Sequence, residues 1–169
     1  MQKVLVIQTA FIGDAVLATA LLEKLHQCHS HAQIDLLVRK GNEGLFSHHP
    51  FLREVLVWDK KKNKYRHLLS ILSRIRRERY DLVVNVQRFA ATGFLTAFSG
   101  ARQTIGFDKN PFSYLFTYRI KHLISGAEKP IHEIDRNQRL IARWTDDLPA
   151  KPALYPSDAD YTIAETYTR

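Results

Sequence analysis

Short apolar runs and stretches with helical spacing follow one another along the chain. The apolar runs predict strands at residues 3–8, 33–38, 53–59, 81–87, 103–107 and 117–123. Apolar positions three and four apart predict helices at residues 14–26, 64–79, 90–98 and 130–144, and residues 108–116 have the composition of a loop. Strands that alternate with helices indicate an α/β fold with a doubly wound, mainly parallel sheet and helices on both faces.

The chain divides at about residue 150. Its 169 residues are sufficient for one domain with a substantial core, and we expect residues 1–150 to form that domain. The prolines Pro149, Pro152 and Pro156 then indicate a linker over residues 151–169. A short helical run begins inside this linker after Ser157, whose side chain is suited to cap a helix.

The turn after the first strand holds the strongest candidate for chemistry. In doubly wound folds, the turn at the carboxyl end of a strand lines the ligand crevice. Here Asp14 opens the first predicted helix directly after Gly13, and a glycine allows a ligand to approach the backbone closely. A carboxylate at this place can take a proton from a substrate hydroxyl that attacks an electrophile. Helix capping explains an acidic residue here equally well.

One segment makes the chain basic. The net charge is +8, and residues 60–79 hold nine basic residues and one acidic residue, so this window carries the whole excess. Such a patch attracts phosphate groups on nucleic acid, on an anionic membrane or on an acidic glycolipid. For the arginines of residues 74–79, a solvated helix face is an equal explanation. Four lysines follow a strand and are therefore expected near the crevice: Lys60, Lys61, Lys62 and Lys64.

Two further groups of basic residues occur late in the chain. Arg119, followed by Lys121 and His122, is a second candidate for binding an anion. His132 and Arg136 lie four residues apart in the last predicted helix, and therefore on one face of it. For both of these residues, ordinary surface polarity is the alternative explanation.

Several classes of protein are disfavoured. The turn at residues 9–14 lacks the three spaced glycines of a dinucleotide-binding loop, and the chain has no Gly-Lys-Ser/Thr phosphate-binding loop, so a nicotinamide enzyme or a nucleotide triphosphatase is not expected. His48 and His49 have no matching ligand spacing, and we predict no metal site. The basic window has Tyr65 as its only aromatic residue, so specific nucleic-acid binding is not expected.

The sequence also bears on the compartment. Cys28 is the only cysteine and cannot form an intramolecular disulfide, which fits a reducing cytoplasm. No apolar run approaches the roughly 20 residues of a membrane span, and the first residues lack the pattern of a signal peptide.

Five stretches in the expected order resemble the family 9 glycosyltransferases, the ADP-heptose:lipopolysaccharide heptosyltransferases. The most specific part is the turn Ile12-Gly13-Asp14, and together the stretches extend over nearly all of the chain. They are residues 7–22, 80–87, 105–107, 116–119 and 131–138. One departure is notable, because Arg88 and Phe89 follow Gln87 where the family continues with small residues.

The resemblance implies a Rossmann-like, doubly wound domain that forms the N-terminal half of a two-domain GT-B enzyme. This half binds the acceptor, the phosphorylated core or lipid A region of lipopolysaccharide, and no cofactor. A second domain, whose motifs this chain lacks, binds the donor ADP-heptose. Transfer inverts the anomeric centre without a metal, with Asp14 as the general base. The residues implied in acceptor binding are Thr9, Gly13, Lys60, Lys61, Lys62, Lys64, Gln87, Arg119, His132 and Arg136.

The resemblance also implies a place of action and a set of partners. We expect a cytoplasmic protein that is peripheral at the inner face of the inner membrane, where it meets an anionic surface. This chain alone is expected to be inactive, and self-association through a bare interdomain face is a further expectation. The alternative function is a non-catalytic basic binding module of the same fold for phosphorylated glycolipid or nucleic acid.

Overall fold

A computed structural model describes residues 1–61, 63–123 and 131–168 of the chain. Its centre is a six-stranded sheet in the order β3-β2-β1-β4-β5-β6 in which every pair of neighbours is parallel. The strands are β1 (Lys3–Gln8), β2 (Gln33–Arg39), β3 (Leu52–Trp58), β4 (Leu82–Asn85), β5 (Gln103–Phe107) and β6 (Tyr118–Ile120). The predicted doubly wound α/β fold is therefore confirmed.

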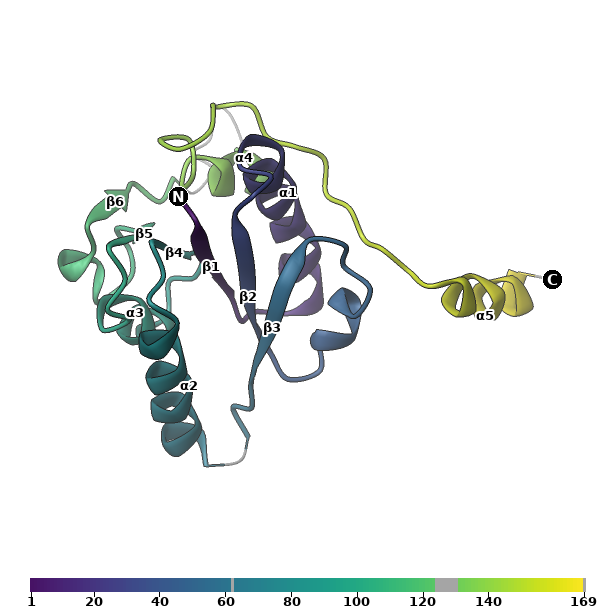
Figure 1. Ribbon diagram of the computed structural model, residues 1–169, viewed down its shortest axis with the longest axis horizontal. Helices are drawn as coiled ribbons and strands as arrows, with labels where there is room; N and C mark the ends of the chain where they lie inside the picture. Colours follow the sequence, from purple (N-terminus) through teal and green to yellow (C-terminus); the bar gives the residue numbers. More distant parts are fainter. Residues whose placement is uncertain (62, 124–130, 169) are drawn as a thin grey trace.

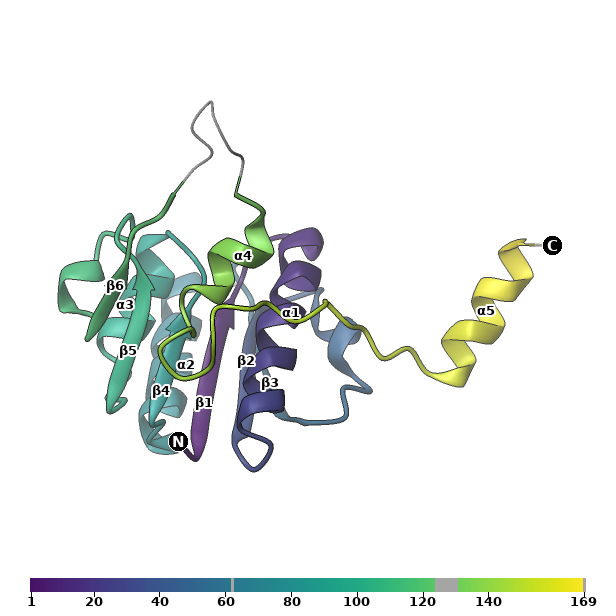
Figure 2. The ribbon, with the colours of Figure 1, turned by 90° about the horizontal axis from the view of Figure 1, so that it is seen from above.

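Helices cover both faces of the sheet (Figures 1 and 2). One face packs against α1 and the region of α4, and the other packs against α2 and α3. The α-helices are α1 (Ile12–Cys28), α2 (Lys64–Glu78), α3 (Ala90–Ala97), α4 (Glu133–Gln138) and α5 (Asp158–Thr168), and short 3₁₀ turns occur at η1 (Glu43–Phe46) and η2 (Ser113–Leu115).

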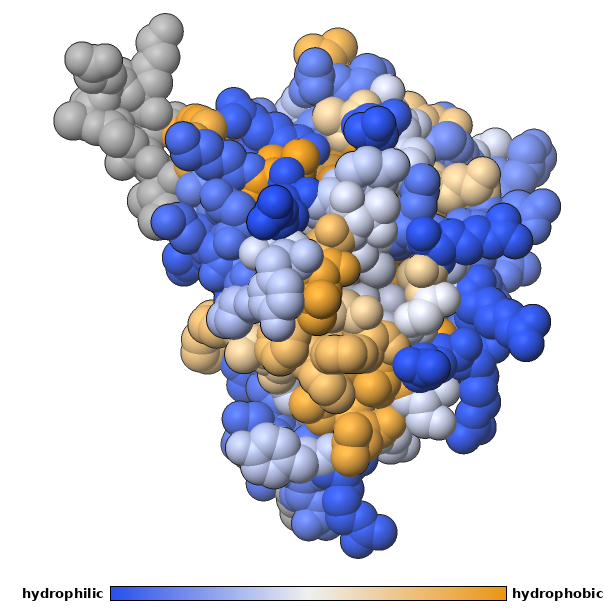
Figure 3. Space-filling view, turned by 90° about the vertical axis from the view of Figure 1, so that its left-hand side faces the viewer, coloured by the Kyte–Doolittle hydropathy of each residue, from blue (hydrophilic) through white to orange (hydrophobic). Residues whose placement is uncertain are grey.

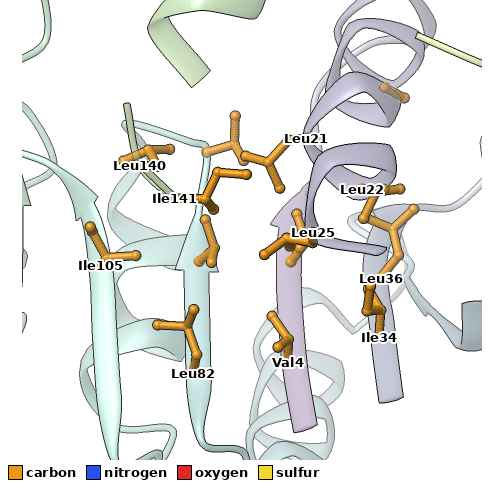
Figure 4. Close-up of a cluster of buried hydrophobic side chains, with 14 of the residues drawn as sticks. Val4, Leu21, Leu22, Leu25, Ile34, Leu36, Leu82, Ile105, Leu140 and Ile141 are labelled. Atoms are coloured by element: carbon orange, nitrogen blue, oxygen red, sulfur yellow. The ribbon is translucent and has the colours of Figure 1, made fainter. Parts of the chain in front are cut away.

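The sheet is apolar on both faces because helices bury both. In β1, Val4 and Val6 belong to one core cluster, whereas Leu5 and Ile7 belong to the other. This explains why the strand appears in the sequence as a continuous apolar run rather than as an alternation. Figure 4 shows the first cluster, where the leucines of α1 point toward Val4 and its neighbours on the sheet.

Helix α2 separates its apolar and basic side chains. Leu68, Leu72 and Ile75 are buried against the second face of the sheet together with Ile71. Leu69 is exposed, although its spacing from Leu72 fits the same face of the helix. The arginines of this helix lie away from the core and reach partners at its rim, such as Glu54, which pairs with Arg74.

Two expected helices differ in length from those observed. Helix α1 begins at Ile12, so Gly13 lies in its first turn rather than in the turn before it. Helix α4 ends at Gln138 because the chain then continues in turns that bury Leu140 and Ile141 in the core. Its expected start at Pro130 lies outside the described residues.

The segment after the domain lies along α1 before it leaves. The backbone N–H of Ala153 donates to the Thr19 hydroxyl at 3.0 Å, and the Tyr155 hydroxyl donates to Glu23 at 2.8 Å. We call this segment, residues 151–157, the strap. Beyond the strap, α5 stands apart from the domain (Figure 1). The Ser157 hydroxyl accepts from the backbone N–H of Asp160 at 3.3 Å, which confirms its capping role. Within the described ranges, no helix has the length and apolar character needed to cross a bilayer.

Candidate functional site

A pocket lies at the point where the strand order reverses. The chain proceeds outward from β1 to β3 on one side and from β4 to β6 on the other, which opens a crevice beyond the carboxyl ends of β1 and β4. The pocket has a volume of about 580 Å³. It is lined by Thr9, Ala10, Phe11, Asp14, Arg39, Lys60, Val86, Gln87, Arg88, Phe89, His122, Glu133 and Arg136.

Two buried glutamines are hydrogen-bonded to each other beside this pocket, and one of them, Gln87, lines it. The side-chain amide of Gln87, at the end of β4, donates to the side-chain oxygen of Gln8 in β1. Gln8 in turn donates to the backbone carbonyl of Asp14 at 3.3 Å and accepts from the N–H of Ala10 at 3.2 Å. Both amides are buried, so these bonds stabilise one arrangement of the two strand ends and the first turn of α1.

Asp14 occupies the third position of α1 and lines the pocket. The helix cap is Phe11, which provides no side-chain hydrogen bond, and no donor to the Asp14 carboxylate is found in the described part of the chain. Capping by a hydrogen bond therefore does not explain this residue. Asp14 is partly exposed and is one of the residues that line the pocket.

Lys60 extends from the end of β3 back across the pocket. Its ammonium donates to the backbone carbonyl of Thr9 at 2.7 Å and lies 4.9 Å from the centre of the Trp58 ring. Partial desolvation, followed by the charges of Arg39 and Lys64, lowers the pKa of Lys60. A bound anion would stabilise the charged form of Lys60 and so offset both effects, which makes this lysine suited to bind an anion.

The pocket contains more positive than negative charge. Four basic residues line it, against the carboxylates of Asp14 and Glu133. Arg136 lies 3.4 Å from Glu133, and Arg39 stacks 4.8 Å from the Phe11 ring. Burial, followed by the charges of Arg136 and Arg88, also lowers the pKa of His122 in this pocket.

The structure brings together five of the eleven residues implied from the sequence. Thr9, Asp14, Lys60, Gln87 and Arg136 line the same pocket although they come from four different parts of the chain. Gly13 precedes Asp14 in the first turn of α1, and a Cβ built there meets no atom within 4 Å. The space beside this turn is therefore open to a ligand.

The other implied residues lie elsewhere. Lys61 lines a neighbouring groove with Lys60, and Lys64 begins α2 with its ammonium 5.8 Å from the Tyr65 ring. His132 is the cap of α4, where its ring accepts from the N–H of Ile134 at 3.2 Å. Arg119, on the edge strand β6, lines a separate groove with two other arginines. Lys62 lies outside the described residues.

Sequence reasoning missed Arg39 among the residues that line the pocket. It ends β2, just as Lys60 follows β3, so the carboxyl end of a neighbouring strand was the available signal. Phe11 and Glu133 were also missed, because the spacing of neither residue in the sequence distinguishes it from an ordinary surface residue.

Metal ligation is not indicated by the described residues. Within the described ranges, no three histidine, cysteine or acidic side chains are grouped so that they could hold an ion. His49 packs among aromatic rings instead, with its ring centre 4.4 Å from that of Phe51 and 4.8 Å from that of Tyr155.

A curated protein and several solved structures are similar to this chain. The chain is 23% identical to lipopolysaccharide heptosyltransferase 1 of Campylobacter coli over 116 residues, which are 69% of this chain and 34% of that protein. No protein-family model matches the chain.

Three solved structures share the fold. A family 9 glycosyl transferase of Veillonella parvula superposes with a TM-score of 0.83 at 20% identity, over 98% of this chain and 48% of that one. For Escherichia coli ADP-heptose LPS heptosyltransferase II, the TM-score is 0.73 at 21% identity, over 98% and 50%. For E. coli heptosyltransferase WaaC with ADP, it is 0.67 at 19% identity, over 99% and 53%.

The sheet order and the pocket at the switch point define the class: a Rossmann-like domain of the kind that forms half of a GT-B glycosyltransferase. More particularly, the chain resembles the family 9 heptosyltransferases in sequence and in fold, which confirms the resemblance found in its motifs. It spans about half the length of the solved structures and about a third of the curated relative.

Proposed function

We propose that this chain is the acceptor-binding half of an inverting glycosyltransferase that transfers heptose from ADP-heptose to the inner core of lipopolysaccharide. The observation that carries the proposal is the Asp14 carboxylate, which lines a basic pocket at the sheet's switch point without a protein hydrogen-bond donor in the described part of the chain. Two relatives bear names that specify lipopolysaccharide, and one of these specifies ADP-heptose as well.

The proposed reaction is an in-line displacement. Asp14 takes the proton of an acceptor hydroxyl, and the oxygen of that hydroxyl forms a bond to the anomeric carbon of the heptose. The bond between that carbon and the phosphate oxygen of the donor breaks, and ADP leaves with the electron pair from the opposite face. The donor is bound by a second domain, and this half holds no cofactor.

The charges of the pocket support an acidic acceptor. Lys60 donates a hydrogen bond to Thr9, which directly follows β1, so its ammonium lies beside the turn that leads to Asp14. Arg39, Arg88 and Arg136 complete a basic lining. Phosphate and carboxylate groups of an inner core match this lining, because guanidinium groups bind such anions through paired hydrogen bonds.

The first experiment measures what the pocket binds. Phosphorylated, deacylated core oligosaccharide and single- and double-stranded DNA are titrated against the chain at one ionic strength. We expect preference for the oligosaccharide, and a loss of about tenfold or more with Lys60→Ala. Arg119→Ala is the matched control from a separate groove. Preference for DNA, or equal losses in the two variants, would contradict the proposal.

The second experiment tests the base in a polypeptide that includes a donor-binding half. We expect Asp14→Asn to lower kcat by about 100-fold or more with little change in the acceptor KM, since a general base acts mainly in the transition state. Glu133→Gln, the other carboxylate of the pocket, should have a much smaller effect on kcat. Equal kcat values for Asp14→Asn and the parent would mean that Asp14 is not the general base. A parent that binds the acceptor but transfers no heptose would instead favour the alternative, a binding module without catalysis.

A further inference from the structure

An apolar surface beside the pocket has no partner within the described part of the chain. It is formed by α3 and the loop that contains η2, and we call it the aromatic platform. Its side chains are Phe89, Phe94, Phe98, Phe112, Tyr114 and Leu115. Four of them are between 40% and 68% exposed, and Figure 3 shows apolar surface gathered on this side of the molecule.

The aromatic platform is held in a fixed shape. The ring centre of Phe94 lies 5.0 Å from that of Phe98 and 6.1 Å from that of Phe112. Below them, the side chain of Asn110 donates to the carbonyl of Phe89 at 3.0 Å and accepts from the N–H of Phe112 at 3.0 Å. These bonds join the loop to the start of α3, so little conformational entropy remains to be lost when a partner covers the platform.

Basic side chains border this surface. Arg76 of α2 reaches the carboxyl end of α3 and donates to the carbonyl of Phe98 at 3.1 Å. Arg88 and Lys109 are exposed at the other ends of the platform. None of the three forms an ion pair with an acidic residue in the described ranges, and Asp108 instead accepts from the backbone N–H of His122. Apolar surface bordered by unpaired cations is complementary to an anionic lipid bilayer, which offers hydrocarbon inside a negatively charged layer.

The aromatic platform is continuous with the pocket. Phe89 caps α3 and also lines the pocket that contains Asp14, and Arg88 lines the same pocket. An acceptor anchored in a bilayer could therefore place its sugar at Asp14 while its lipid end remained in the membrane below the platform. This continuity, which rests on the proposed function, distinguishes the platform from other exposed apolar side chains, such as those of α5.

We propose that the aromatic platform and its basic border form the face by which this protein binds an anionic membrane. The platform side chains insert at the level of the headgroups and the first methylene groups, while Arg76 and Lys109 pair with lipid phosphates. The pocket then opens at the membrane surface.

The test is sedimentation of the full chain with vesicles. Vesicles of phosphatidylcholine with one-third phosphatidylglycerol are compared with vesicles of phosphatidylcholine alone, at low and high salt. The platform variant is Tyr114→Ser with Leu115→Ser. The control variant, Tyr161→Ser with Leu148→Ser, removes the same two residue types where they are 58% and 71% exposed outside the platform. Thermal unfolding checks that both variants fold.

We expect the parent chain and the control to bind the anionic vesicles, and the platform variant to bind about tenfold or more weakly. Added salt should weaken all binding. Equal binding to neutral vesicles, or equal losses in the two variants, would overturn the inference. So would a platform variant that binds vesicles normally but changes the oligomeric state in light scattering, because the surface would then be an interface between copies.

The vesicles contain no acceptor, which separates this inference from the proposed function. If the chain fails to bind vesicles but binds core oligosaccharide, only the membrane face is wrong. If it binds vesicles but not oligosaccharide, the proposed function is wrong and the membrane face stands.

Discussion

His49 is a buried histidine without a hydrogen-bond partner for either ring nitrogen among the described residues. Its side chain is 1% exposed and lies against Phe51 and Tyr155, and two further titratable groups, Glu23 and His26, act on it. The Glu23 carboxylate is 4.0 Å from its ring, and the charge of His26 opposes its protonation. Burial, followed by His26, lowers the pKa of His49 to about 4 from 6.5.

This shift predicts a loss of stability in mild acid. Between pH 6.5 and about 4 the unfolded chain binds a proton at His49 that the folded chain does not, so the free energy of unfolding falls as the pH falls. At about 1.4 kcal/mol per pH unit, the loss reaches about 3 kcal/mol. Urea unfolding at a series of pH values measures it.

The matched variants are His49→Gln and His48→Gln, which change a buried and an exposed neighbour. We expect His49→Gln to flatten the slope of stability against pH above pH 5, and His48→Gln to retain it. The opposite pattern would mean that another group causes the acid sensitivity.

At the scale of elements, Gly93 in α3 shows how one contact joins a helix to a loop. A Cβ built at Gly93 would lie 1.9 Å from the side-chain oxygen of Asn110. That same amide binds the carbonyls of Gln87 and Phe89. The close approach therefore positions both the end of β4 and the start of α3.

We expect Gly93→Ala to destabilise the fold by about 1–3 kcal/mol, because the extra methyl group displaces a buried, hydrogen-bonded amide. Gly13→Ala is the control, since it is also helical and its Cβ meets no atom within 4 Å. There alanine should stabilise by roughly 0.5–1 kcal/mol through helix propensity. Chemical denaturation measures both values, and a stabilising Gly93→Ala would contradict the packing described.

The elements differ in how well the sequence predicts them. The bounds of β1 and β5 match the prediction. In β1 an apolar run lies between Lys3 and Gln8, and β5 lies between the polar residues Arg102 and Asp108. Helix α4 is shorter than its pattern, because packing of Leu140 and Ile141 against the sheet favours turns over further helix. Local spacing does not contain that tertiary preference.

The pocket was predictable only in part, for a related reason. The topology places Asp14, Lys60 and Gln87 at one edge of the sheet, and this follows from their positions after strands. The charge of a residue does not show which part of the surface its side chain reaches. For this reason Lys64 and Arg119 were assigned to the same pocket, although they lie elsewhere. The division at residue 150 stays a prediction.

At the scale of the whole molecule, α5 adds no buried side chain to the domain among its residues 158–167. Removing residues 158–169 should therefore change Tm by less than about 1 °C. A longer deletion from residue 151 also removes the two hydrogen bonds of the strap to α1. It should lower Tm by roughly 4–8 °C, at about 1 kcal/mol per bond. Calorimetry compares the two deletions, and equal Tm values would show that the strap contributes nothing.

Helix α1 carries Asp14 near one end and receives the strap at Thr19 and Glu23. These three positions span about 14 Å of one rigid rod, at 1.5 Å per residue. A domain that follows the strap would thus be connected to the same helix that carries the Asp14 carboxylate. The alignment of that domain with the reacting hydroxyl would depend on the two hydrogen bonds at Thr19 and Glu23. A substitution at either position would then misalign the two halves without altering any residue of the pocket.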